Sequence, residues 1–225
     1  MVKLFKGDCL QLMSDMADQS IDCIVTDPPF NMGYTWKGWN NTFEKLENDN
    51  IQDNTHSEWF EKIVIELHRV LKQDSSFYCF IDWRNYPRFY NIIRKYFVIK
   101  NCIIWDKKSI GLGYYFRYQH EMIIYATKGN PKLLTKDVSD IWNCPRNSVQ
   151  DYESPTEKPV KLLKKAILNS TKKGDIIFDP FMGGGNTGVA ALELERDFIG
   201  AEILDSYYII AKRKITNFKK QAKLF

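Results

Sequence analysis

The segment Ile21-Asp22-Cys23-Ile24-Val25-Thr26-Asp27-Pro28-Pro29-Phe30 decides how this chain folds. Its first five residues are short, β-branched and mostly apolar, which predicts a buried β-strand. The strand must stop at the two prolines, because proline has no backbone N–H to donate to a sheet. A carboxylate, a proline turn and an aromatic ring are therefore expected together at the carboxyl end of a strand. In open α/β sheets, ligands bind at this edge.

The residues after this strand suit a planar ring that carries an exocyclic amino group. Asp27 and the carbonyl of Pro28 are two acceptors without a competing donor, since Pro28 and Pro29 have no N–H. Phe30 adds a flat apolar face on which such a ring can stack. A solvated aspartate in an ordinary Pro-Pro turn is the structural alternative, and these four residues alone do not decide between the two.

A glycine-rich segment lies far down the chain, between a predicted strand at 175–178 and a predicted helix. Gly183-x-Gly185-x-x-Gly188 lets the backbone turn tightly and approach a ligand closely. Glu202 ends the next predicted strand, where its carboxylate can accept hydrogen bonds from ribose hydroxyls. Asp179 suits a cationic amino group better than a pyrophosphate, so the pattern favours S-adenosylmethionine over NAD. A glycine turn that only packs helix on strand is the alternative.

Length and composition indicate a globular α/β protein. The chain has 225 residues, of which 44% are hydrophobic and 27% charged, which is enough for one domain with a sizeable core. Aromatic residues reach 14%, and the net charge of +4 permits a polyanionic partner without requiring one.

The cysteines and histidines argue against disulfides and metal sites. The five cysteines are widely spaced and form no CxxC pair, so we expect buried free thiols in a reducing compartment. The three histidines form no cluster with ligand spacing, so no metal site is expected. Neither a leader peptide nor an apolar run near 18 residues is found, so we expect no membrane contact and a cytoplasmic location.

Hydrophobic periodicity predicts further elements along the chain. Strands are expected at 3–6, 75–81, 98–105, 121–126, 175–178 and 198–203. Helices are expected at 10–16, 87–96, after Pro159, after Gly188, from about 205, and from the capping box Thr55-x-x-Glu58 to Leu71. Only a loop separates 98–105 from 121–126, which predicts an antiparallel pair.

Asp27-Pro28-Pro29-Phe30 and Phe178-Asp179-Pro180-Phe181-Met182-Gly183-Gly184-Gly185 together resemble the catalytic and cofactor motifs of S-adenosylmethionine-dependent DNA amino-methyltransferases. The catalytic motif comes first, as in the beta group of that family, which is a circular permutation of the usual order. Four further segments resemble family motifs in the same order: Gly7-Asp8-Cys9-Leu10, Gln119-His120-Glu121, Ser154-Pro155-Thr156-Glu157-Lys158-Pro159 and Arg196-Asp197-Phe198-Ile199-Gly200-Ala201-Glu202.

The resemblance implies an α/β fold with a doubly wound, seven-stranded mixed sheet of the Rossmann-like methyltransferase type, including one antiparallel hairpin strand. It implies methyl transfer from S-adenosylmethionine to the exocyclic amino nitrogen of adenine in double-stranded DNA, because members whose motif begins with Asp mostly modify adenine. The implied catalytic residues are Asp27, Pro28, Pro29 and Phe30. The implied cofactor-binding residues are Asp8, Cys9, Lys158, Phe178, Asp179, Pro180, Phe181, Gly183, Gly185, Asn186, Thr187 and Glu202.

This chain departs from the family pattern in two respects. Gly184 and Asn186 stand where members often have Ser and Thr. We expect residues 1–225 to form a single methyltransferase domain. Its expected target-recognition region, about 128–152, is short for the family. DNA recognition is therefore expected to be loose, or to be shared with insertions at about 31–56 and 107–118 or with a second subunit, either in a homodimer or from a different chain.

The expected mechanism needs no strong base. Asp27 should act ionised, at an ordinary pKa, by accepting an amino hydrogen during transfer. A base inside a duplex is out of reach, so it must flip out and stack on Phe30. Four alternatives stay open: methylation of the cytosine N4 amino group, methylation of adenine in RNA, a non-catalytic S-adenosylmethionine-binding subunit, and a nicotinamide dehydrogenase.

Overall fold

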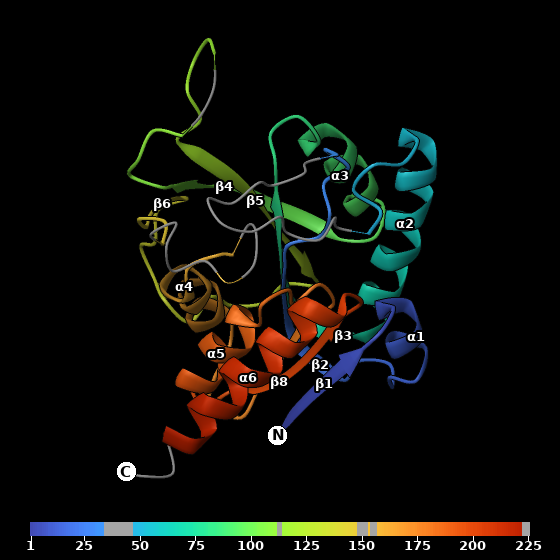
Figure 1. The fold of residues 1–225 in the computed structure, drawn as a ribbon, viewed down its shortest axis with the longest axis vertical. Coiled ribbons are helices and arrows are strands. Elements are labelled where there is room, and N and C mark those ends of the chain that lie inside the picture. The colour runs from blue at the N-terminus through green and yellow to red at the C-terminus, as the bar shows by residue number, and fades with distance from the viewer. Residues whose placement is uncertain (34–46, 112–113, 148–152, 154–156, 222–225) are drawn as a thin grey trace.

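An eight-stranded sheet forms the centre of the computed structural model, which describes residues 1–33, 47–111, 114–147, 153 and 157–221 (Figure 1). The strand order is β1-β8-β7-β2-β3-β5-β4-β6. The strands are β1 (Val2–Lys6), β2 (Ile21–Thr26), β3 (Leu71–Ile81), β4 (Val98–Asp106), β5 (His120–Lys128), β6 (Ile141–Asn143), β7 (Ile176–Asp179) and β8 (Asp197–Glu202).

The sheet confirms the doubly wound mixed class and corrects the number of strands. β5 runs antiparallel to both β3 and β4, and every other pairing is parallel. The antiparallel pairing of β4 with β5 confirms the one predicted from the loop between 98–105 and 121–126. The eighth strand is β6, which lies within the expected target-recognition region at about 128–152. Its three residues are exposed, buried and exposed in turn, and a segment this short gives no clear periodic signal in the sequence.

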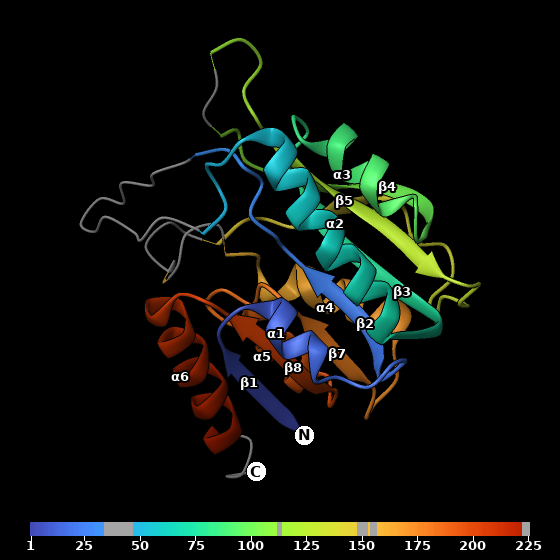
Figure 2. The same cartoon turned by 90° about the vertical axis from the view of Figure 1, so that its right-hand side faces the viewer.

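Six helices cover the two faces of the sheet within the described residues. They are α1 (Cys9–Ser14), α2 (Asp53–Val70), α3 (Tyr86–Ile93), α4 (Val160–Ser170), α5 (Asn186–Glu193) and α6 (Asp205–Gln221). The first three contribute to one apolar core and the last three to a second core on the opposite face (Figures 1 and 2). This two-sided cover explains why the central strands are apolar on both faces.

Helix α2 begins at Asp53, two residues before the predicted capping box. Gln52 is its N-cap and makes no side-chain capping bond, so Thr55 does not start the helix. His56, in the first turn, is fully buried and lies 3.1 Å through its Nε2 from the carbonyl oxygen of Pro29. Tertiary packing of this turn therefore overrides the local capping signal, and the expected insertion at 31–56 ends earlier.

The chain reverses its direction of winding between β2 and β7. From β2 the chain crosses through α2 to β3 on one side, and from β7 it crosses through α5 to β8 on the other. β2 and β7 are paired neighbours, so their carboxyl ends meet at a topological switch point. Ligands bind in the crevice at such a point in open α/β sheets.

Candidate active site

A pocket lies at the switch point where the carboxyl ends of β2 and β7 meet. Most of the residues predicted for the site line it. These are Asp8, Cys9, Asp27, Pro29, Lys158, Asp179, Pro180, Phe181, Gly183, Asn186, Thr187 and Glu202. Segments from both ends of the chain and from its middle therefore meet in one place, while the role of each side chain stays a prediction.

Four predicted residues lie outside the lining of this pocket. Phe178 is fully buried in the sheet, and Pro28 is buried behind the turn. Phe30 is half-buried, with its ring edge-to-face against Phe89 at a centroid distance of 6.5 Å. A Cβ on Gly185 would lie 2.8 Å from Ala211, so this glycine lets α5 and α6 pack closely.

Asp27 directly follows β2 and has two unlike carboxylate oxygens. Its Oδ2 accepts a hydrogen bond from the Nζ of Lys158 at 2.6 Å. Its Oδ1 is buried and has no hydrogen-bond partner among the described residues. The expectation of an ordinary pKa is wrong, because burial raises the pKa of Asp27 to about 6 despite the opposing charge of Lys158.

Lys158 joins Asp27 to a chain of charges. Its side chain is 6% exposed and also pairs with Glu121 Oε2 at 3.3 Å. Glu121 in turn pairs with Lys107 at 2.7 Å. Although burial opposes it, the Asp27 and Glu121 carboxylates raise the pKa of Lys158, so the ammonium stays charged.

The charge chain adds two residues that sequence reasoning did not assign to the site. Glu121 appeared there only as part of a motif at the start of a strand, and Lys107 only within a loop. An acid at the first positions of an antiparallel strand reaches the same sheet edge as the ends of the parallel strands. That placement is the sequence signal that identifies Glu121.

His56 was also missed, because it belongs to no cluster of metal ligands. Its Nε2 must donate to the carbonyl of Pro29, because a carbonyl oxygen can only accept. Burial lowers the pKa of His56, which favours the neutral ring with its proton on Nε2. The ring therefore holds the proline turn that follows Asp27. Trp59, one turn further along α2, lines the pocket with its ring 5.7 Å from that of Phe181.

Asp179 ends β7 and is surrounded by neutral donors. Its Oδ1 accepts from the Thr26 hydroxyl at 2.9 Å and from the Phe181 backbone N–H at 3.1 Å. Its Oδ2 accepts from the Thr187 hydroxyl at 2.7 Å. Burial raises the pKa of Asp179 to about 7, since these bonds supply no full positive charge. A cationic group of a ligand would favour the ionised form.

Glu202 and the glycine turn are fixed to each other. Glu202 Oε2 accepts from the Gly183 N–H at 3.0 Å, and Oε1 accepts from the Leu204 N–H at 2.9 Å. Gly183 has a φ of +49°, and a Cβ there would meet nothing within 4 Å. Asp8, the N-cap of α1, lines the same pocket across from β8.

The side chains of the pocket match the parts of S-adenosylmethionine. Three carboxylates, from Asp8, Asp179 and Glu202, can accept hydrogen bonds from an amino group and from ribose hydroxyls. Trp59 and Phe181 offer aromatic surface for a planar purine. These three carboxylates disfavour a pyrophosphate, because they would repel its negative charge.

The segment before α4 is tied to the last two helices. Asn186 Nδ2 donates to the Lys158 carbonyl at 3.0 Å, and Lys214 Nζ pairs with Glu157 at 2.9 Å. The preceding residues of that motif, 154–156, lie outside the described residues, as do parts of the expected insertions at 34–46, 112–113 and 148–152. The fixed segment explains how Lys158 reaches Asp27 across the sheet.

Two further expectations concern membrane spans and metals. Among the described helices, none has both the length and the apolar character needed to cross a bilayer. In the same part of the chain, no group of three or more His, Cys, Asp and Glu side chains is arranged to hold a metal ion.

The sequence of this chain is similar to those of known DNA methyltransferases. The sequence profile of a family described as DNA methylase matches residues 21–213. The type II methyltransferase M2.MboI of Moraxella bovis is 31% identical, over 94% of this chain and 86% of the relative. The DNA adenine methyltransferase YhdJ of Escherichia coli K12 is 30% identical, over 94% of this chain and 82% of the relative.

Solved structures show the same fold at lower identity. An M1.HpyAVI–SAM complex superposes with a TM-score of 0.74 at 23% identity, covering 96% of this chain and 99% of the other. The cytosine-N4-specific PvuII DNA methyltransferase gives a TM-score of 0.76 at 18% identity, covering 98% and 92%.

Proposed function

Because the chain belongs to the N6/N4 family of S-adenosylmethionine-dependent DNA methyltransferases, we propose that its target is the N6 amino group of adenine in double-stranded DNA. The observation that carries this proposal is the buried, unpartnered Oδ1 of Asp27 at the switch point. An acceptor that is removed from water and left without a donor is costly unless a ligand supplies one. An exocyclic amino group would supply that donor.

The choice of adenine rests on two supports. The motif begins with Asp27, as in family members that mostly modify adenine, and the relative YhdJ bears the name DNA adenine methyltransferase. Methylation of cytosine at N4 is the second candidate, since the PvuII enzyme with that specificity has the same fold. Both bases present two amino hydrogens to the same pair of acceptors, so the distinction depends on the shape of the base.

Asp27 and Pro28 act on the amino group in this proposal. An aromatic amine is a weak nucleophile because its lone pair is delocalised into the ring. Hydrogen bonds from its two N–H groups to Asp27 Oδ1 and the Pro28 carbonyl favour a tetrahedral nitrogen and stabilise the positive charge that develops on it. With a pKa of about 6, Asp27 is mostly ionised at neutral pH and can act as this acceptor.

Lys158 and His56 position these acceptors without contacting the base. Lys158 occupies Oδ2 of Asp27, which leaves Oδ1 as the free oxygen. His56 holds the carbonyl of Pro29 and so fixes the direction of the turn. A pre-set acceptor pair needs little reorganisation during transfer, which is the main source of electrostatic catalysis.

The cofactor binds beside these groups in the proposal. Asp179 faces the amino end of S-adenosylmethionine, Glu202 accepts from the ribose and Asp8 from the adenine edge, with Gly183 leaving room for the backbone to approach. When bound, S-adenosylmethionine supplies a methyl group on a positively charged sulfur as the electrophile. The aromatic rings of Trp59 and Phe181 limit the access of water to this part of the pocket.

The target base must leave the duplex to reach Asp27, at a cost of a few kcal/mol. Phe30 is proposed to offset about 1–3 kcal/mol of this cost by stacking. Residues 1–225 would form one methyltransferase domain, with DNA contacts from the insertions near 31–52, 107–118 and 128–152, alone or with a second subunit.

The test is sequencing that detects methylated bases in DNA from cells that express this chain, with Asp27→Ala as the matched control. N6-methyladenine at a defined sequence, absent with the variant, is the expected result. N4-methylcytosine in nucleoside analysis would identify the second candidate. Modified RNA without modified DNA would contradict the proposal.

A further inference from the structure

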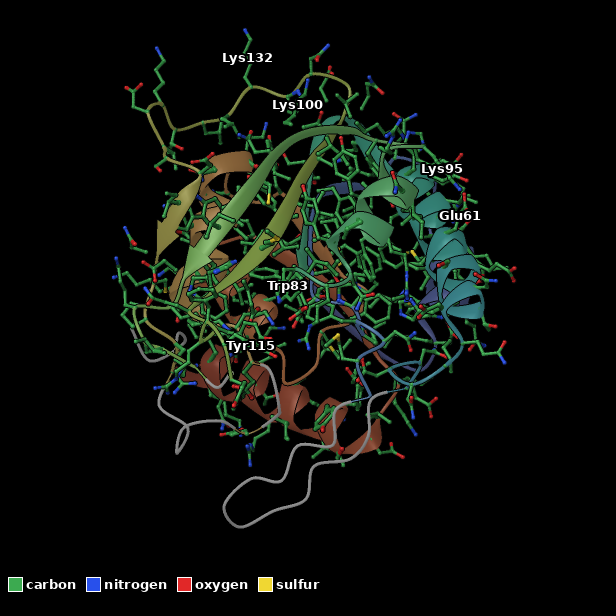
Figure 3. All side chains as sticks on the ribbon, turned by 90° about the horizontal axis from the view of Figure 1, so that it is seen from above. Glu61, Trp83, Lys95, Lys100, Tyr115 and Lys132 are labelled. Carbon is green, nitrogen blue, oxygen red and sulfur yellow. The ribbon has the colours of Figure 1, made fainter. Side chains whose placement is uncertain are left out.

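Three consecutive aromatic side chains stand in solvent at the tip of the hairpin between β4 and β5. Tyr114, Tyr115 and Phe116 are 93%, 89% and 94% exposed. The hairpin projects well beyond the helices at the top of Figure 1, and Figure 3 looks down on it with Tyr115 labelled. Exposed aromatic side chains in a row are unusual on a protein surface and mark a site of contact with a partner.

The hairpin rises from the same sheet edge as the pocket. β5 runs antiparallel to β3, so its first residue lies at the carboxyl ends of the parallel strands, where Asp27 also stands. The base of the hairpin is joined to Asp27 by ion pairs, from Lys107 to Glu121 and from Glu121 to Lys158. The hairpin therefore projects from the edge of the sheet at which Asp27 lies.

Side-chain and backbone contacts brace the stem of the tip. The Gly111 N–H donates to the Tyr118 carbonyl at 2.7 Å, and Arg117 Nε donates to the Gly111 carbonyl at 2.8 Å. Arg84, from the loop after β3, places its guanidinium 5.7 Å from the centroid of the Tyr118 ring. The three aromatic residues are thus carried on a supported turn.

The charge around the tip matches a polyanion. Residues 107–120 contain two lysines, one arginine and no acid. Lys107 and Lys108 pair with acids at the stem, whereas no carboxylate among the described residues pairs with Arg117. Aromatic side chains beside a cation that no described carboxylate neutralises suit nucleic acid, because bases stack on the rings and phosphates attract the cation.

We propose that Tyr114, Tyr115 and Phe116 insert into duplex DNA beside the target base and hold open the gap that the flipped base leaves. This inference rests on the proposed function. Unstacking a base step exposes apolar surface, and an aromatic wedge covers it. Extrusion of a base is easier when its pairing partner is absent, so the wedge matters most for a fully paired duplex.

The test uses duplex oligonucleotides that carry the site found by the sequencing described above. One duplex is fully paired, and the other has an abasic position opposite the target. The triple variant Tyr114→Ser, Tyr115→Ser, Phe116→Ser is compared with the wild type by methyl transfer from labelled cofactor. The changed side chains are almost fully exposed, so the fold keeps its core. Ile209→Ser, at another exposed apolar side chain on α6, is the matched control.

On the paired duplex, we expect kcat/KM of the triple variant to fall by about 10- to 100-fold. On the abasic duplex it should stay within about threefold of the wild type, because little base pairing has to be broken. Ile209→Ser should match the wild type on both, and Tyr115→Phe should retain most activity because its ring survives.

Three outcomes would overturn the inference. An equal loss on both duplexes would assign the tip to general DNA binding. No loss on either would leave these residues as a surface for a protein partner. Failure of the wild type to methylate either duplex would refute the proposed function itself, and the wedge with it.

Discussion

Asp27 and Asp179 occupy equivalent places at the ends of neighbouring strands, yet their surroundings differ in charge. Asp27 has a buried ammonium on one oxygen and no partner on the other. Asp179 has two hydroxyl donors and one backbone N–H, which leave neither oxygen unbonded. Burial raises the pKa of both carboxyls, to about 6 and about 7.

In the proposed function, this difference lets one residue type serve two purposes within one pocket. A carboxylate oxygen held by Lys158 is oriented, and its second oxygen is available to a reacting group. A carboxylate held by neutral donors fastens β7 to β2 and to α5 and presents a diffuse negative surface to a ligand. Asp27 should therefore govern turnover, whereas the cluster around Asp179 and Glu202 should govern cofactor affinity.

The largest expected effect is that of Asp27→Ala on turnover. Loss of the acceptor for the amino group should lower kcat by about 10²- to 10³-fold. The affinity for S-adenosylmethionine should stay nearly unchanged, because the contact matters most in the transition state. Labelled methyl transfer and calorimetry measure the two quantities.

Phe30→Ala supplies the contrast to Asp27→Ala. Phe30→Ala should slow methyl transfer because base extrusion becomes harder. A mismatch at the target should therefore restore part of the rate of Phe30→Ala and none of the rate of Asp27→Ala. Equal restoration of both variants, or normal turnover by Asp27→Ala, would show that the two residues do not divide the work.

Glu202→Ala tests the cluster around Asp179 and Glu202, which is proposed to govern cofactor affinity. It removes an acceptor next to Gly183 and should weaken S-adenosylmethionine binding by about 1–3 kcal/mol. The value of kcat at saturating cofactor should change little. Calorimetric titration tests this, with Glu202→Gln as the variant that keeps the shape and one acceptor. Unchanged affinity in Glu202→Ala would refute the assignment.

The pH dependence sharpens the role of Lys158. The active form needs Asp27 ionised, so kcat/KM of the wild type should fall tenfold per pH unit below about 6 and level off above it. Lys158→Gln removes the cation that lowers the pKa of Asp27, so the acidic limb should move to higher pH. Activity lost near pH 6 should return in more alkaline buffer.

A merely structural role for Lys158 would produce a different profile. In that case Lys158→Gln would lower the rate equally at all pH values and leave the limb where it is. Lys158→Arg, which keeps a positive charge beside Asp27, should keep the limb close to that of the wild type.

The smallest expected effect is that of Thr187→Val, an isosteric change beside Asp179. Loss of one hydroxyl donor should lower the free energy of unfolding by about 0.5–1.5 kcal/mol. Denaturation by urea measures it, and Thr187→Ser, which keeps the hydroxyl, is the control. Thr187→Val should leave kcat at saturating cofactor almost unchanged. A large loss of kcat would show that Asp179 and its partners take part in turnover, and would contradict the proposed division between the two aspartates.

Local patterns were sufficient to predict much of the sheet. The apolar run before Asp27, the strand before Asp179 and the antiparallel hairpin all lie where the sequence indicates. Each of these segments combines β-branched residues with residues that end a strand. Pairing with neighbouring strands in the sheet supports the same extended conformation. β6 escaped prediction because three residues carry no periodicity, and α2 began early because His56 packs against the proline turn.

The residues of the pocket that stand at the ends of strands were predicted from the sequence, and the residues that hold them in place were not. Asp27 follows a strand, and Asp179 and Glu202 each end one, so topology brings them together. Topology also places Glu121 at this edge of the sheet, but no spacing rule encodes the contacts of Lys107 and His56, which join elements far apart in the chain. The unequal oxygens of Asp27 depend on Lys158, which lies 131 residues away along the chain.

Cys9 lines the pocket that we propose for S-adenosylmethionine. A thiolate is a stronger nucleophile than an aromatic amine, so an ionised cysteine there would be alkylated by the cofactor itself. Burial, followed by the charge of Asp8, raises the pKa of Cys9 to about 12 and keeps the sulfur protonated. In the proposed function, burial of this thiol would therefore protect the enzyme from methylating its own pocket.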